Sequence, residues 1–193
     1  MEVVLASLSP ARKRLLEQLG FKVTQIPSGI KEAKAKGASI DQVISIVTEN
    51  AKKKAEKVYE VMKSSIVIAA DTVVYFENKV LGKPQDAEEA RQMLKNLRGK
   101  WHSIISGYAV YSPKGSKVGY EITGVKMRNY SDAEIEYYLS TKEYVGKAGA
   151  YAIQGMGAFL VEEVRGCFYN IAGLPIRSII ESLAFLGYWP PSE

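Results

Sequence analysis

The chain is poor in the residues on which several common kinds of protein site depend. Among its 193 residues there is one cysteine, Cys167, so an intramolecular disulfide is excluded and a reducing compartment is favoured. There is one histidine, His102, which excludes a metal site built from several histidines. We expect this side chain to make a structural hydrogen bond rather than to act in catalysis.

Several longer patterns are missing as well. No apolar stretch approaches the roughly 20 residues that cross a bilayer, and there is no internal repeat or low-complexity linker. No signal peptide is visible before the first strand-like run. The glycine-rich stretch 146–157 lacks the spacing of a P-loop or a dinucleotide fingerprint. We therefore expect a cytoplasmic protein without a membrane-spanning segment.

The composition is that of a globular protein. The hydrophobic fraction is 47%, and the length allows either one large domain or two small lobes around a sizeable core. The formal net charge of +5 favours anionic partners. Charge alone does not choose between nucleotides, nucleic acid and a membrane surface.

Apolar periodicity and turn residues predict the secondary structure. The predicted strands are 2–7, 21–26, 66–76, 80–81, 101–111, 117–127 and 158–164. The predicted helices are 10–19, 41–62, 86–97, 131–139 and 175–186. The long hairpin formed by 101–111 and 117–127 favours a mixed sheet over a purely parallel one.

The four aspartates differ in their positions. Three of them precede helix-like segments and are interpreted as N-caps: Asp41, Asp86 and Asp132. Asp71 instead ends the buried apolar run 66–70, where a carboxylate is costly unless it has a cation, a metal or several donors. Lys83 follows a short hairpin that can bring it back beside this acid. The pattern fits a phosphate–metal site, and it equally fits a structural acid paired with a buried basic group.

Two basic clusters lie on predicted helices. At the start of the first helix, Ser7, Ser9 and Arg12 lie among free backbone N–H groups, which suits an anion site, although a solvated basic face is the alternative. The lysine run 52–54 lies on a predicted helix and is interpreted as a solvated face. Glu32, taken alone, is interpreted as a surface loop acid.

Six short motifs resemble the signatures of the Maf proteins, and they follow that family's order over nearly the whole chain. They are LASLSPARKRLL (5–16), ADTVV (70–74), LGKP (81–84), HSIISG (102–107), GKAGAYAIQG (146–155) and NIAGLP (170–175). Each motif is weak by itself, but together they are highly specific.

The resemblance implies a fold and an activity. The expected fold is α/β, with an elongated, curved mixed sheet flanked by helices, related to the inosine triphosphatase fold. It would form a single domain over 1–193, with two lobes and a central cleft. The expected activity is that of a nucleoside triphosphate pyrophosphatase, which uses Mg²⁺ or Mn²⁺ to release the monophosphate and pyrophosphate. The expected partner is the nucleotide, with a homodimer possible and neither nucleic acid nor a membrane involved.

The resemblance also assigns roles to residues. Asp71 matches the catalytic acid, described as the proton acceptor, and Glu32 and Asp71 would hold the metal. Thr72 and Gln154 match positions tied to base choice. The remaining positions match residues that line the cleft and bind substrate: Ser7, Arg12, Lys54 and Lys83.

Ala11 occupies a third position connected with base choice. The uridine- and thymidine-directed branch usually has arginine there, the 7-methylguanosine-directed branch has a bulky aromatic residue, and alanine fits neither. Thr72 and Gln154 side with the first branch, so we expect hydrolysis of dTTP and UTP. The alternatives are a 7-methyl-GTP pyrophosphatase and a non-enzymatic nucleic-acid-binding or division-regulating protein, which would leave a buried Asp71 without a reason.

Overall fold

A computed structural model describes residues 1–35 and 37–190. In this part of the chain seven strands form one sheet, in the order β2-β1-β3-β5-β6-β7, with β4 paired to β3. The pairs of β1 with β2 and with β3 are parallel, and the other pairs are antiparallel. The strands are β1 (Glu2–Leu5), β2 (Lys22–Gln25), β3 (Val67–Phe76), β4 (Lys79–Leu81), β5 (Trp101–Ser112), β6 (Gly115–Met127) and β7 (Val161–Arg165). The prediction of a mixed sheet is confirmed.

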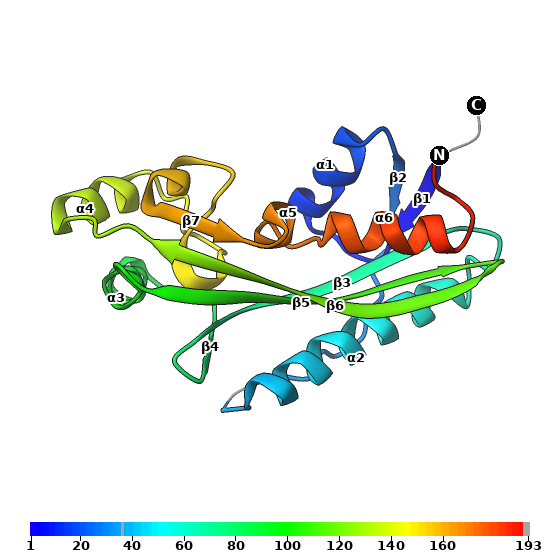
Figure 1. Ribbon diagram of the computed structural model, residues 1–193, viewed down its shortest axis with the longest axis horizontal. Helices are drawn as coiled ribbons and strands as arrows, with labels where there is room; N and C mark the ends of the chain where they lie inside the picture. The colour runs from blue at the N-terminus through cyan, green and yellow to red at the C-terminus, as the bar shows by residue number, and fades with distance from the viewer. Residues whose placement is uncertain (36, 191–193) are drawn as a thin grey trace.

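Helices cover both faces of this sheet (Figure 1). The long strands β3, β5 and β6 run along the long axis of the molecule, with α2 beneath them and α1, α5 and α6 above. The helices α3 and α4 lie with β7 at one end, and β1 and β2 lie at the other. The helices are α1 (Pro10–Gln18), α2 (Ile40–Tyr59), α3 (Ala87–Leu97), α4 (Asp132–Ser140), α5 (Phe168–Ile171), α6 (Ile176–Phe185) and the short 3₁₀ helices η1 (Ala148–Ala150) and η2 (Met156–Leu160). Among these described residues, no helix is long and apolar enough to span a bilayer.

Two of the predicted N-caps are wrong. The cap of α2 is Ser39 and the cap of α4 is Ser131, and each closes a capping box with the residue three positions later. Asp41 and Asp132 therefore lie in the first turn of their helices, where a negative charge complements the helix dipole. Asp86 is confirmed as the cap of α3, since its carboxylate accepts a hydrogen bond of 2.8 Å from the amide of Glu89.

The strand predicted at 158–164 begins later, at Val161. Residues 156–160 form η2 instead, and the carboxylate of Glu143 accepts hydrogen bonds from the amides of Met156 (3.0 Å) and Gly157 (2.9 Å). The strand was predicted from the apolar residues of this stretch alone. The carboxylate of Glu143, which lies 13 or more positions earlier in the chain, satisfies two of its amides and so stabilises the helical turn instead.

The packing of α2 on the sheet depends on a residue without a side chain. Gly107 of β5 pairs with Asp71 of β3, and a Cβ built on Gly107 would lie 2.2 Å from the carbonyl oxygen of Val47. Backbone of α2 thus meets backbone of β5 at this point, a closeness that only glycine permits. The contact brings the inner face of α2 directly over the middle of β3.

The two larger hydrophobic clusters lie toward opposite ends of the sheet. One is built mainly on α3, α4 and the neighbouring parts of β3, β5 and β6 and includes Leu94, Met127 and Tyr138. The other is built mainly on β1, α1 and α6 and includes Leu5 and Leu183. The middle of β3, which carries Asp71, lies between them.

Candidate active site

Asp71 lies in the middle of a strand and not at its end. The strand β3 continues past it to Phe76, because the β-forming residues after Asp71 extend the ladder with β5 without interruption. The residue is 9% exposed, and each carboxylate oxygen has a partner. Oδ1 accepts from Nζ of Lys54 at 3.1 Å, and Oδ2 accepts from Nδ2 of Asn50 at 2.8 Å. Burial of this charge is therefore compensated by a cation and an amide.

Lys54 connects three oxygen atoms at the centre of the site. Its ammonium lies 3.1 Å from Oδ1 of Asp71 and 2.6 Å from Oε1 of Glu32, and it also donates to the carbonyl of Ala70. It is only 6% exposed. The interpretation of the lysine run as a solvated face is therefore wrong for Lys54. It holds for the two preceding lysines, which make half-exposed i,i+4 pairs with glutamates of the same helix.

Arg12 is fixed by neutral acceptors on β3 and at Gly173. Its Nε donates to the carbonyl of Gly173 and its Nη1 to that of Ala70, both at 2.8 Å, and Nη2 reaches the hydroxyl of Thr72 at 3.3 Å. Burial lowers the pKa of its guanidinium, and the nearby charges of Asp71 and Glu32 act in the opposite direction. Among the described residues no carboxylate forms an ion pair with Arg12, so its charge stays available for an anion.

These side chains line one cavity of about 370 Å³ at the junction of the two clusters. Of the residues that the sequence singled out, Arg12, Glu32, Lys54, Asp71, Thr72 and Lys83 line it, as does Ala11. Lys83 reaches the cavity because β4 folds back along β3, with Leu81 opposite Val74. Three of the predicted cationic side chains and both predicted carboxylates thus meet in one cavity.

Two of the expected residues are not part of the cavity wall. The hydroxyl of Ser7 accepts from Nη1 of Arg12 at 3.4 Å and from the amide of Ser9, so it contacts the site through Arg12. Gln154 is exposed in the turn before η2 and does not line the cavity.

Other residues of the site were not singled out by sequence reasoning. Asn50 contacts Asp71 directly, Ser106 shares a 2.7 Å hydrogen bond with Thr72, and Lys147 lines the cavity as a further cation. The signal for Asn50 is its place on the buried face of α2, where Val43, Val47, Asn50, Lys54 and Val58 follow helical spacing. Polar residues on such an apolar face indicate a buried polar cluster.

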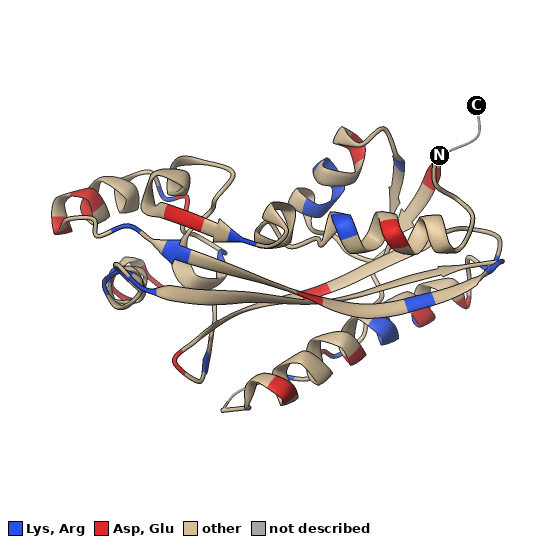
Figure 2. Ribbon diagram, viewed as in Figure 1, with Lys and Arg blue, Asp and Glu red and all other residues tan. Residues whose placement is uncertain are grey.

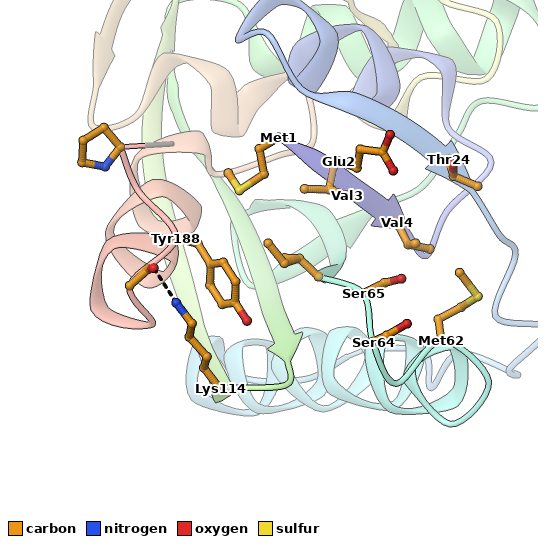
Figure 3. Close-up of a pocket in the computed structure, with 13 residues that line it drawn as sticks. Met1, Glu2, Val3, Val4, Thr24, Met62, Ser64, Ser65, Lys114 and Tyr188 are labelled. Atoms are coloured by element: carbon orange, nitrogen blue, oxygen red, sulfur yellow. Dashed lines mark hydrogen bonds between the residues drawn. The ribbon is translucent and has the colours of Figure 1, made fainter. Parts of the chain in front are cut away.

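A larger cavity, of about 820 Å³, lies at the end of the sheet near β1 (Figure 3). Its polar lining is scattered, with Glu2, Thr24, Ser64 and Lys114 on different sides of β1. The carboxylate of Glu2 pairs with Lys22, outside the lining, and the ammonium of Lys114 is taken by the carbonyl of Gly187. Converging acids and bases are found in the smaller cavity, so we place the chemistry there.

The smaller cavity suits a hard divalent cation. Oxygen atoms of Asp71 and Glu32 converge on one cationic group, the ammonium of Lys54, and carboxylate oxygens are the ligands that Mg²⁺ and Mn²⁺ prefer. Within residues 1–35 and 37–190 no group of three or more histidines, cysteines or acids is placed to hold a metal. Two carboxylates with further ligands from water and phosphate are a usual set for Mg²⁺, so the residues fit it.

The chain matches known proteins over nearly its whole length. A family model described as "Maf-like protein" covers residues 2–186. The dTTP/UTP pyrophosphatase of Caldicellulosiruptor bescii is 45% identical, with 96% of this chain and 95% of that protein aligned. The proteins of the same name from Dictyoglomus turgidum and Pyrococcus furiosus are each 44% identical, over 97% and 93% of this chain and the same shares of their own.

A solved structure is similar at a lower level. A nucleoside-triphosphatase / dITP/XTP pyrophosphatase from Mycobacterium abscessus aligns with 98% of this chain and all of its own, with a TM-score of 0.46 and 17% identity. That similarity is too weak to carry an argument. The family model and the curated relatives, in contrast, confirm the resemblance seen in the six motifs, and the chain belongs to the Maf-like protein family.

Proposed function

We propose that this chain is a nucleoside triphosphate pyrophosphatase that converts dTTP and UTP to the monophosphate and pyrophosphate. The observation that carries the proposal is the convergence of Asp71, Lys54 and Arg12 on one cavity. The relatives named dTTP/UTP pyrophosphatase, which align over more than nine-tenths of the chain, support the substrate class. In this proposal water attacks the α-phosphorus and pyrophosphate leaves.

The chain's own residues would act mainly by positioning and by neutralising charge, as phosphoryl chemistry requires. Arg12 is rigidly held by its carbonyl acceptors, so its remaining N–H capacity faces the cavity in one orientation. Lys83 is exposed where it lines the cavity, and the long flexible side chain of lysine suits a contact with the leaving pyrophosphate. Ser7 would act indirectly, through its contact with Arg12.

Asp71 is the proposed proton acceptor for the attacking water. Asn50 holds one of its oxygens, and the other lies beside Lys54 on the cavity wall. A carboxylate oxygen has two lone pairs, so a single donor leaves room for a further partner. Asp71 and Glu32 are also the residues that would hold Mg²⁺ or Mn²⁺, and the bound ion would supply charge neutralisation at the phosphate oxygens.

Base choice is the finer part of the proposal. Thr72 and Ala11 line the cavity, whereas Gln154 lies outside its wall. The hydroxyl of Thr72 is already engaged with Ser106 and with the carbonyl of Gly173. Alanine at position 11 leaves one side of the cavity without a large side chain, so we expect selectivity looser than that of a relative with arginine there.

The test is a panel of UTP, dTTP, ATP, GTP and 7-methyl-GTP, each with Mg²⁺ and with Mn²⁺, in which pyrophosphate and orthophosphate are measured separately. We expect pyrophosphate as the first product and the highest kcat/KM for UTP and dTTP. Orthophosphate as the first product would contradict attack at the α-phosphorus. If 7-methyl-GTP had the highest kcat/KM, the chain would instead be a 7-methyl-GTP pyrophosphatase of the same family.

The rival of another class is a protein that binds nucleic acid and breaks no bond. Its support is the net charge of +5. However, α1, α2 and α6 each carry both acidic and basic residues instead of a stripe of one sign (Figure 2), and such a stripe is the usual footprint of a polymer. Absence of turnover together with tight polynucleotide binding would favour this rival.

The single domain of two lobes, the homodimer and the cytoplasmic location stay predictions.

A further inference from the structure

Asn50 is a buried polar side chain next to the cavity that makes three hydrogen bonds. It is 3% exposed on the inner face of α2, one helical turn before Lys54. Its Nδ2 donates to Oδ2 of Asp71 (2.8 Å) and to the carbonyl of Ala33 (3.0 Å), and its Oδ1 accepts from the amide of Ala33 (2.9 Å). Both hydrogens and one acceptor position of the amide are therefore used.

The two partners of Asn50 belong to the two elements that carry the carboxylates. Asp71 is on β3, and Ala33 directly follows Glu32 in the segment between β2 and α2, where the structure describes neither helix nor strand around it. The Glu32 side chain is 52% exposed, so packing does little to hold it. The amide of Asn50 donates to the carbonyl of Ala33 and accepts from its N–H. This pair of hydrogen bonds holds the segment against α2, in the way that two residues of neighbouring strands hold each other.

We propose that Asn50 is a positioning residue that sets the separation of the Glu32 and Asp71 carboxylates and the orientation of Asp71. By engaging Oδ2 of Asp71, the amide turns Oδ1 toward Lys54 and the cavity. By clamping Ala33, it holds Glu32 on the same ammonium. This inference rests on the proposed function, because the distance between the two carboxylates matters for a shared cation and a bound phosphate.

If Asn50 had only a structural role, its removal would have a different effect. In that case its loss would lower the stability of the protein, while the remaining folded molecules would keep their kcat and their affinity for metal. A positioning role predicts the opposite weighting, because partners behind the ligands of a metal site are worth about 10–100-fold in affinity or activity.

The test variant is Asn50→Leu, which keeps the approximate size and removes all three hydrogen bonds, with Asn50→Ser as a second variant in case leucine prevents folding. The matched control is Thr48→Val on the same helix, because the buried Thr48 hydroxyl has no hydrogen-bond partner among the described residues. Three quantities are measured on each: kcat and KM for UTP, Mn²⁺ binding without nucleotide by electron paramagnetic resonance, and hydrogen–deuterium exchange of the segment around Ala33.

For Asn50→Leu and Asn50→Ser we expect kcat to fall about 10–100-fold with KM changed less, and Mn²⁺ binding to weaken by a similar factor. We also expect faster exchange at the amide of Ala33, and wild-type values for Thr48→Val. Unchanged kcat, Mn²⁺ affinity and Ala33 exchange in folded variants would overturn the inference. If the wild type hydrolyses no nucleotide, the proposed function fails, while the Mn²⁺ and exchange measurements still decide whether Asn50 positions the two carboxylates.

Discussion

At the scale of single residues, the site is neutralised by the protein's own cation. The ammonium of Lys54 lies between Asp71 and Glu32, so two carboxylates share one buried positive charge. Removing one member of this cluster would leave a buried charge without a partner, which is strongly destabilising. Loss of an exposed ion pair elsewhere in the molecule would cost much less. A metal or a triphosphate that enters the cavity has to compete with Lys54 or to share its partners.

The first prediction concerns the charge of Asp71. Asp71→Asn keeps the shape, and its amide can still pair with Asn50, but it removes the negative charge and the basicity. We expect kcat to fall by about 10² or more, the scale of positioned acid–base groups. Circular dichroism and thermal unfolding should show that the fold is retained.

The control for this variant is Asp86→Asn. Asp86 caps α3 away from the cavity, and asparagine is an equally good cap, so this chemically identical change should leave kcat near the wild-type value. Near-normal turnover of Asp71→Asn would exclude Asp71 both as proton acceptor and as a required metal ligand.

At the scale of elements, the site depends on how closely α2 approaches the sheet. One face of this helix supplies Asn50 and Lys54, and Gly107 allows the helix backbone to rest on β5 directly beside Asp71. The contact sets the height of both polar side chains above β3. A helix and a strand that are far apart in sequence thus build the centre of the site by a backbone contact.

The second prediction follows from this contact. Gly107→Ala places a methyl group where the Val47 carbonyl lies, so α2 has to move outward. We expect a loss of about 1–3 kcal/mol or more in the free energy of unfolding, as for other overpacked cores. Hydrolytic activity should fall with it, because Lys54 and Asn50 leave Asp71. Urea unfolding monitored by tryptophan fluorescence measures the first effect.

The control is Gly82→Ala, where an added Cβ meets no atom within 4 Å and the backbone needs no positive φ. Its unfolding free energy should stay within about 0.5 kcal/mol of the wild type. Equal stability of Gly107→Ala and Gly82→Ala would mean that α2 adapts without cost and that Gly107 does not set its position.

At the scale of the whole molecule, one long sheet (Figure 1) joins two hydrophobic clusters. The cavity lies where the two clusters meet. Both clusters contribute to the wall, with Val74, Ile104 and Tyr151 from the first and Ala172 beside the second. His102 lies in the first region, where its Nε2 pairs with the hydroxyl of Tyr151 at 2.8 Å. The expected structural hydrogen bond of the histidine is thereby observed.

The third prediction concerns stability against acid. Burial lowers the pKa of His102 from 6.5 to about 4, so the unfolded chain binds a proton in a pH range where the folded chain does not. The free energy of unfolding therefore has its full value above about pH 6.5, where His102 is neutral in both states. It falls as the pH decreases from about 6.5 toward 4, because protonation of His102 then favours the unfolded chain. Between pH 7.5 and pH 5 we expect His102 to account for a loss of about 2 kcal/mol.

Urea unfolding at a series of pH values tests this expectation. His102→Gln keeps a polar partner for Tyr151 but does not titrate, so its stability should change less over the same window. Identical pH dependence of the two proteins would contradict a lowered pKa of His102 in the folded state.

Much of this structure could be predicted from the sequence, because the signals are local. Periodicities of 2 and of 3.6 residues predicted the long strands and the amphipathic helices, and Asp86 was recognised as a cap. The motifs around Arg12, Asp71 and Lys83 led to three residues that line the cavity. Such features depend on a residue's neighbours along the chain, which a sequence displays directly.

What the sequence determined by itself is thus the mixed α/β architecture, the family and most of the charged side chains that line the cavity. The tertiary structure alone decided which of them touch. Arg12 meets Gly173 across 161 positions, Lys54 is buried although its neighbours in the lysine run are not, and Asn50 joins Asp71 to the segment of Glu32. The physical reason is that hydrogen-bond partners of buried polar groups are set by packing of α2 on β5 and by loop closure, which no local pattern encodes.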